Sequence, residues 1–269
     1  MKARSNFLFH AYMVAFLAYM LLPLIVMGGA AFNDSRFPSV YPWVGWTDRW
    51  FLDLWNDGRM WVAFRNTIGV ALAVVVMSVP IGTAAAILIN SVGGTARSVL
   101  YGFMIAPVLT PGAVIGISTL LFWNKFSVPA GLHLSAVGQT SYISAFVMLL
   151  VLARLQSFDR ALEEAALDLG ASHAQVVRRI LLPHLYPAIG AGAAIAFFQS
   201  VENFNTTLFT RGTYDTLTVY VFSRVRSGIT PTINALALIL VTLTIIGALW
   251  YEISRRRTMR RLALRPAPA

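Results

Sequence analysis

Long apolar runs separated by short charged clusters dominate this chain. Six stretches of 22 to 31 residues contain no Asp, Glu, Lys or Arg. They lie between Arg4 and Asp34, Arg65 and Arg97, Arg97 and Lys125, Lys125 and Arg154, Arg179 and Glu202, and Arg226 and Glu252. A helix needs roughly 20 apolar residues to cross about 30 Å of hydrocarbon, and these runs lack the alternation of a membrane β-barrel. The pattern predicts an all-α, polytopic membrane protein with six transmembrane helices. The spans are expected near 10–32, 63–91, 99–123, 137–154, 187–209 and 232–253.

The composition agrees with a chain that lies in a membrane. Of its 269 residues, 57% are hydrophobic and 12% are charged, whereas about 25% of an average soluble chain is charged. These proportions exclude a disordered chain, a nucleic-acid-binding tail and an ordinary soluble enzyme. The chain has no Cys, which excludes disulfides, thiolate zinc sites and a Cys nucleophile. We therefore expect a single transmembrane domain over residues 1–269.

The distribution of Lys and Arg predicts which loops face the cytoplasm. With the N-terminus inside, 13 of the 21 basic residues fall on the cytoplasmic side and 8 on the outer side. The C-terminus then also lies inside, where the basic tail 254–269 contacts membrane lipid headgroups rather than nucleic acid. A cleaved signal peptide is the alternative for the first run, but its apolar stretch exceeds the roughly 7–15 residues of such a segment.

The outer segment 33–62 is rich in tryptophan. It contains five Trp residues among four Asp residues, and we expect a short helix over 47–61 that lies on the outer surface. Two interpretations stay open. The rings could form an interfacial belt, where an apolar ring is buried and its N–H stays hydrated, or they could dock a substrate.

The segment 155–186 is the informative cytoplasmic stretch. Its pattern predicts two short amphipathic helices that meet at a sharp corner. Gly170 supplies the left-handed end of the first helix, and Ser172 with Gln175 forms a capping box that starts the second. Pro183 is expected to stop the second helix.

A specific motif lies in this segment. Its residues are Glu164-Ala165-Ala166, three residues, Gly170, nine residues, Ile180, one residue, and Leu182-Pro183. This pattern resembles the EAA loop of the membrane subunits of ABC importers. The sequences Phe32-Asn33-Asp34-Ser35 and 225–235 are similar to those of the spermidine/putrescine permease group.

The resemblance implies a multi-pass permease of the bacterial cytoplasmic membrane, the inner membrane, with both termini cytoplasmic. It implies that a pair of ATPase subunits binds the loop through Glu164, Ala165, Ala166, Gly170, Leu182 and Pro183. It also implies a second permease subunit, either a different chain or a second copy, and a periplasmic or extracellular solute-binding protein. Alternating access, driven by closure of the ATPase pair, is the mechanism.

The chain lacks the residues of a nucleotide-hydrolysing protein. A Walker A loop needs a Lys after its glycines, and Lys occurs only at positions 2 and 125. We therefore expect no cofactor on this chain, with ATP and Mg bound by the partner ATPase. The four His residues are isolated, so we expect no metal site and no catalytic residue.

Polar residues inside the apolar runs are candidates for a substrate path. Thr110 lies beside Pro111 and Gly112 in the third run, and Pro and Gly can free backbone groups to face a cavity. Glu202 is the strongest candidate, because a carboxylate at that depth is costly unless it meets water or a partner. Its neighbours Gln199, Asn203 and Thr206 make the fifth helix polar, and Glu202 and Thr206 are expected on one face.

Two interpretations of Glu202 stay open. It could contact an ammonium-bearing solute in the path, or it could form an internal ion pair with Arg211, Arg224 or Arg226.

The expected function is a permease subunit of an ATP-driven importer of small polar organic solutes, of polyamine-like kind. Polyamine permeases tend to carry two adjacent acids where this chain has Glu202-Asn203, and an acid where it has Gly112. These differences keep an opine, an amino-acid-derived compound or a phosphonate open as the solute. A self-contained secondary transporter or a membrane enzyme would need further intramembrane ion-coupling or acid–base groups, which the runs lack.

Overall fold

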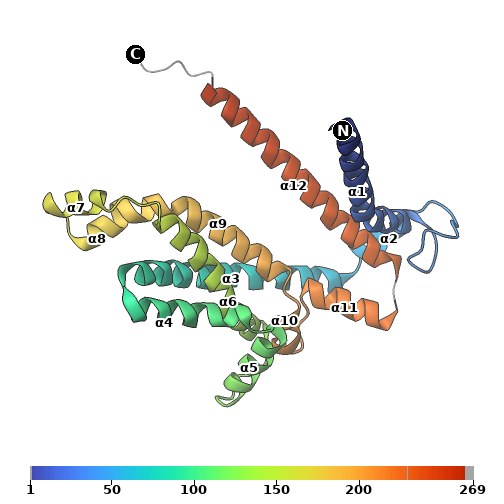
Figure 1. The fold of residues 1–269 in the computed structure, drawn as a ribbon. Helices are drawn as coiled ribbons and strands as arrows, with labels where there is room; N and C mark the ends of the chain where they lie inside the picture. Colours follow the sequence, from blue (N-terminus) through green and yellow to red (C-terminus); the bar gives the residue numbers. More distant parts are fainter. Residues whose placement is uncertain (1, 229, 264–269) are drawn as a thin grey trace. The chain divides into compact units, whose positions relative to one another are not determined.

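The computed structural model describes residues 2–228 and 230–263, and in these residues it contains helices and an isolated β-bridge but no strand. The all-α prediction is confirmed. The chain divides into two compact units. The first unit comprises residues 1–58 and 221–269, and the second comprises residues 59–220. Each unit is described separately (Figure 1).

The first unit is built on two long helices. These are α1 (Lys2–Phe32) and α12 (Pro231–Ala263), which pack against each other. The short helix α2 (Arg49–Trp55) packs on α12, and Trp50 is buried there with Ala31 and Ala235. The outer helix expected over 47–61 is shorter than predicted. The turn at residues 56 and 57 separates α2 from the next helix. The end of the basic tail, 264–269, lies outside the described residues.

A single buried asparagine ties the outer loop of this unit to the end of α1. Asn33 is fully buried. Its amide nitrogen donates to the carbonyl oxygens of Ser39 and Pro42, at 2.8 and 3.1 Å, and its amide oxygen accepts from Val44 N at 2.8 Å. Its carbonyl oxygen accepts from the indole of Trp50 at 2.8 Å. The loop is therefore a fixed structure, although most of its aromatic rings stay exposed.

The second unit contains the other helices. In chain order they are α3 (Gly58–Ser91), α4 (Gly94–Ile105), the 3-10 turn η1 (Ala106–Leu109), α5 (Gly112–Asn124), α6 (Leu132–Leu155), α7 (Ala161–Asp168), α8 (His173–Val176), the π turn η2 (Val177–Leu181), α9 (Leu182–Val201), α10 (Asn205–Thr210) and α11 (Leu217–Ser227), which ends in the first unit. The most buried helix is α6, whose apolar side chains form the core with α3 and α9. At Gly82 of α3 a Cβ would lie only 2.5 Å from the carbonyl oxygen of Ser144 in α6, so a glycine is needed for these helices to approach.

The third apolar run is not one helix, and the prediction of a continuous helix over 99–123 is wrong. It folds as α4 with η1, followed by α5, and the two parts are bent by 103°. Thr110 has the extended conformation, with φ −90° and ψ 131°. A residue that precedes proline is pushed out of the helical region by the proline ring, and Pro111 follows Thr110.

The fifth apolar run is also interrupted, which contradicts the single helix predicted over 187–209. Helix α9 ends at Val201, and α10 restarts at Asn205. Glu202 takes the C-cap position of α9. The side chain of Asn203 replaces part of the lost helical hydrogen bonding, because its amide oxygen accepts from Thr207 N at 3.2 Å.

Among the described residues, five helical segments are long and apolar enough to cross a membrane, and the bent pair would make a sixth. Arg97, near the start of α4, and Glu164, beyond the end of α6, line the same cavity. The start of the bent pair and the end of α6 therefore lie at the same end of the second unit. The bent pair and α6 therefore each cross this unit once, and they run in opposite directions.

Candidate functional site

A pocket of about 400 Å³ opens where the two interrupted runs meet in the second unit. Its wall comes from η1 and the start of α5, from the middle of α6, and from the break between α9 and α10. The lining residues are Pro107, Val108, Thr110, Gly112, Ile115, Tyr142, Phe146, Gln199, Glu202, Asn203, Phe204 and Asn205. Such a volume lies within the range of roughly 300–1,000 Å³ that is typical of small-molecule sites.

Close packing between α5 and α10 brings the two breaks together. Thr206 is fully buried, and its hydroxyl donates to the carbonyl oxygen of Gly112 at 3.2 Å. A Cβ on Gly116 would lie 2.8 Å from the carbonyl oxygen of Thr206, and a Cβ on Gly138 of α6 would lie 3.0 Å from its methyl group. Glycines on both neighbouring helices therefore allow α10 to fit between them.

A chain of hydrogen bonds runs from the buried side of the pocket wall to its lining residues Asn203 and Tyr142. Ser200 donates to the amide oxygen of Gln139 at 2.5 Å, and the amide nitrogen of Gln139 donates to the hydroxyl of Thr207 at 2.8 Å. The Thr207 hydroxyl donates to the amide oxygen of Asn203 at 3.0 Å, and the amide nitrogen of Asn203 donates to the Tyr142 hydroxyl at 2.5 Å. In a membrane interior such bonds satisfy groups that have no water to bind.

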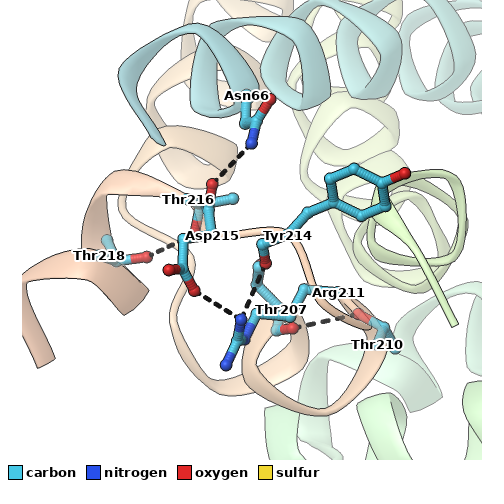
Figure 2. A network of polar contacts seen from close by, with 8 residues as sticks. All are labelled: Asn66, Thr207, Thr210, Arg211, Tyr214, Asp215, Thr216 and Thr218. Carbon is cyan, nitrogen blue, oxygen red and sulfur yellow. Dashed lines mark hydrogen bonds and ion pairs between the residues drawn. The ribbon is translucent and has the colours of Figure 1, made fainter. Parts of the chain in front are cut away.

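A second polar network fixes the loop that follows α10 (Figure 2). Arg211 forms an ion pair with Asp215 at 2.5 Å and donates to the carbonyl oxygen of Tyr214 at 3.0 Å. Asn66 of α3 donates to the carbonyl oxygen of Asp215 at 2.9 Å. The loop between α10 and α11 is therefore fastened to α3.

Four of the five predicted path residues line the pocket, and the fifth does not. Thr110, Gln199, Glu202 and Asn203 lie on the wall. Thr206 is buried behind it, because the break after Val201 removes the helical register that would have set Thr206 beside Glu202. Tyr142, which also lines the pocket, was not predicted from the sequence. It lies in a polar stretch of α6 with Gln139, and that stretch is the signal that could have indicated it.

The proposed ion pairs of Glu202 do not form in the described residues. Arg211 pairs with Asp215, and Arg224 pairs with Asp57 of the same unit. Arg226 lies over the ring of Phe222, 5.9 Å from its centroid. Glu202 is exposed on the pocket wall, and no ion pair to it occurs among the described residues.

The motif segment forms a sharp corner, as predicted. Gly170 has φ +85°. The N–H of Ala171 donates to the carbonyl oxygen of Ala166 at 3.0 Å, and that of Gly170 donates to Leu167 at 2.9 Å. This pair of bonds is the Schellman motif that ends a helix. The capping box at Ser172 also forms, with both of its reciprocal bonds to Gln175.

The prediction that Pro183 stops the second helix is wrong. Residues 173–201 run on as one helical segment through α8, η2 and α9. Leu182 and Pro183 are the first two residues of α9 and directly follow the π turn. A proline is tolerated in the first turn of a helix, because its missing N–H has no required partner there. The altered hydrogen bonding of η2 thus lets the helix continue through the proline.

The exposed side of this segment borders a larger cavity of about 700 Å³. Glu163 and Glu164 of α7 line it together with Arg97 and Arg160. Ala165 is exposed, and the side chains of Leu162 and Leu169 are 54% and 88% exposed. The described residues contain no group of three His, Asp or Glu side chains that could hold a metal ion.

The sequence of this chain is similar to those of known transport proteins. The family described as "Binding-protein-dependent transport system inner membrane component" matches residues 78–260. Putrescine transport system permease protein PotI of Escherichia coli K12 is 33% identical over 252 residues, which cover 90% of this chain and 89% of that protein. Spermidine/putrescine transport system permease protein PotC of the same strain is 29% identical, over 87% of this chain and 89% of that protein.

Solved structures of ABC transporters share the fold. A chain of a bacterial alginate ABC transporter, in complex with an alginate pentasaccharide-bound periplasmic protein, superposes with a TM-score of 0.70 at 18% identity, over 96% of this chain and 97% of that chain. A chain of the MetNI methionine ABC transporter superposes with a TM-score of 0.60 at 17% identity, over 78% and 100%. The chain therefore belongs to the family of inner-membrane components of binding-protein-dependent transport systems, the permease subunits of ABC importers.

Proposed function

We propose that the chain carries small organic amines, a class that includes putrescine, through the pocket at the two helix breaks. The observation that carries this proposal is Glu202, a carboxylate on the pocket wall that pairs with no arginine in the described residues. A carboxylate inside a membrane-spanning region is costly unless it meets water or a cation. A transported ammonium group is such a cation, and the names of PotI and PotC support this solute class.

The pocket also suits the uncharged part of an amine. Phe146 and Phe204 contribute aromatic rings to its wall. These rings offer an apolar surface to the stem of the amine, and an aromatic face also attracts a nearby ammonium. Gln199 and Thr110 add polar groups that can accept hydrogen bonds. A short amine with an apolar stem therefore finds a counter-ion and an apolar surface in one place.

The motif segment is the proposed contact with a separate ATPase. Its exposed apolar side chains, Leu162 and Leu169, would be covered by such a partner. Glu164, Ala165, Ala166 and Gly170 lie on or next to this surface, and Leu182 and Pro183 begin the helix that leads to the pocket. In this proposal the chain itself binds no cofactor, and ATP and Mg belong to the ATPase pair.

The complete importer in this proposal contains further chains. They are two ATPase subunits, a second permease subunit that is a different chain or another copy, and a solute-binding protein outside the membrane. The proposed orientation has both termini in the cytoplasm, which the excess of Lys and Arg on that side supports. The shared cavity of Arg97 and Glu164 agrees with this proposal, which needs both residues on one side of the membrane.

Uptake by cells that carry the complete importer tests the proposed solute class. Glu202→Gln keeps the size of the side chain and removes its charge, so we expect uptake of radiolabelled putrescine to fall at least tenfold. The matched control is Glu252→Gln in α12, which removes a carboxylate that pairs with Arg256 and does not line the pocket. Uptake within twofold of the unmodified protein is expected for the control, and an equal uptake by the Glu202 variant would refute the proposed role of this carboxylate.

A further inference from the structure

The hydrogen bonds at Asn203 leave no freedom in how its amide is oriented. The backbone N–H of Thr207 can only donate, and it lies 3.2 Å from the amide oxygen of Asn203. The amide nitrogen of Asn203 must therefore face Tyr142, whose hydroxyl oxygen lies 2.5 Å away. It follows that the oxygen of Tyr142 accepts this bond.

The hydrogen-bond chain at the pocket wall thus has a direction. Ser200 donates to Gln139, Gln139 to Thr207, Thr207 to Asn203 and Asn203 to Tyr142. Each group uses its donor on the next one, and the chain ends at the phenolic oxygen. The proton of Tyr142 is left over, and within residues 2–228 and 230–263 no hydrogen bond donated by this hydroxyl is found.

The position of Tyr142 indicates which group could accept a hydrogen bond from its hydroxyl. Its side chain lines the same pocket as Glu202. The side chain is half-buried, and its hydroxyl donates to no group in the part of the chain that the structure describes. A solute in the pocket can supply the missing acceptor.

We infer that Tyr142 determines solute specificity by donating its hydroxyl proton to an uncharged hydrogen-bond acceptor on an amine whose ammonium binds Glu202. This inference rests on the proposed function, because it adds a second contact to the same solute. The ligand class is an amine that also carries an amide carbonyl or a hydroxyl group.

The charges around the pocket favour a neutral acceptor over the alternatives. Glu202 is the one acidic residue among the described residues that line the pocket. A carboxylate on the solute would be repelled by Glu202, and a second ammonium would meet a Tyr142 oxygen that already accepts a bond from Asn203. An amide carbonyl avoids both conflicts.

Two solutes with the same stem separate the two contacts. Putrescine has an ammonium at each end, whereas N-acetylputrescine has one ammonium and an amide carbonyl. Radiolabelled uptake is measured for each in cells that carry the complete importer. The solute-binding protein is the same in all strains, so the ratio of variant to unmodified uptake isolates the effect of the membrane pocket.

Tyr142→Phe removes the hydroxyl and keeps the ring. We expect it to lower the uptake of N-acetylputrescine about fivefold, the effect of one neutral hydrogen bond, and to change the uptake of putrescine less than twofold. Tyr101→Phe is the matched control, because Tyr101 lies on α4 and does not line this pocket. We expect the control to change neither uptake.

Asn203→Asp gives an independent test that leaves Tyr142 in place. A carboxylate at position 203 still accepts from Thr207, and its other oxygen takes the proton of Tyr142, so the pocket loses its donor and gains a negative charge. We expect the uptake of N-acetylputrescine to fall as in Tyr142→Phe, and the uptake of putrescine to rise.

The outcomes distinguish the two hypotheses. Equal losses of both solutes in Tyr142→Phe, or no loss of either, would overturn the role of Tyr142 while the amine importer stands. Import of putrescine without N-acetylputrescine by the unmodified protein would overturn it as well. An unmodified importer that takes up neither amine would contradict the proposed function itself, and the inference with it.

Discussion

Thr206 is enclosed by three glycines from two helices. A Cβ would lie 3.1 Å or less from residues of α10 if it were added to Gly112 or Gly116, and 3.0 Å from the Thr206 methyl group if added to Gly138. At Gly116 the obstacle is backbone, the carbonyl oxygen of Thr206 at 2.8 Å. A flexible side chain can move away from an added methyl group, but a helix backbone has to shift as a whole.

Gly116→Ala should therefore destabilise the packing of α10. The expected cost is about 1–3 kcal/mol, as for other overpacked cores, and it should appear as a lower temperature at which the purified protein loses its monodisperse state. Gly102→Ala in the preceding helix is the matched control, because nothing lies within 4 Å of its Cβ. An unchanged unfolding temperature in the Gly116 variant would mean that α5 and α10 are not in close contact.

Single polar residues in apolar runs were informative about the site. Thr110, Gln199, Glu202 and Asn203 stand out in the sequence because a polar group in hydrocarbon needs a reason. Tyr142 did not stand out, because a tyrosine in a membrane helix is also explained by packing or by an interface. Its role depends on the direction of a hydrogen-bond chain that joins residues 61 to 68 positions apart, which no local pattern contains.

Proline shows, at the scale of the helices, why continuity is hard to predict from sequence. Pro111 follows a residue in the extended conformation and ends a helix, whereas Pro183 lies at the start of α9 and interrupts nothing. Pro23 and Pro80 lie within helices. The same residue type breaks or continues a helix according to whether the neighbouring turns can adapt, and that is decided by tertiary packing. The lengths of the apolar runs, by contrast, are a local property of the sequence, and they were enough to predict the fold class.

The corner at Gly170 gives a prediction for the motif segment. A left-handed conformation costs a residue with a Cβ about 1–2 kcal/mol, and the space around Gly170 is open, so Gly170→Ala strains only the backbone. We expect solute uptake and solute-stimulated ATP hydrolysis by the complete importer to fall at least fivefold, while the amount of protein in the membrane is unchanged.

Two variants make the Gly170 result interpretable. Gly190→Ala in α9 also adds a methyl group in open space, but at a helical position, and should leave uptake unchanged. Ser172→Ala removes the capping box, at a cost of about 1 kcal/mol, and should reduce uptake less than the glycine variant does. Full uptake by Gly170→Ala would show that the corner is not part of the coupling.

The path of the whole chain through the membrane can be tested directly, because the sequence has no Cys. Single cysteines at Ser91, Ser172 and Thr213, all exposed positions, can be labelled with a membrane-impermeant maleimide. We expect Thr213→Cys to react in intact cells, and Ser91→Cys and Ser172→Cys to react only after permeabilisation. Reaction of Ser91→Cys and Ser172→Cys from opposite sides would mean that the bent pair enters and leaves the membrane on one face.

The helical segment over residues 173–201 joins two distant regions of the molecule. It is unbroken over 29 residues, or about 43 Å at about 1.5 Å per residue, with the Ser172 capping box at one end and Glu202 at the other. The π turn η2 and Pro187 lie within it, and these are the places where such a helix can bend. A movement near Ser172 would thus reach the rim of the pocket along one helical segment, and bending at these two places would set how much of the movement arrives there.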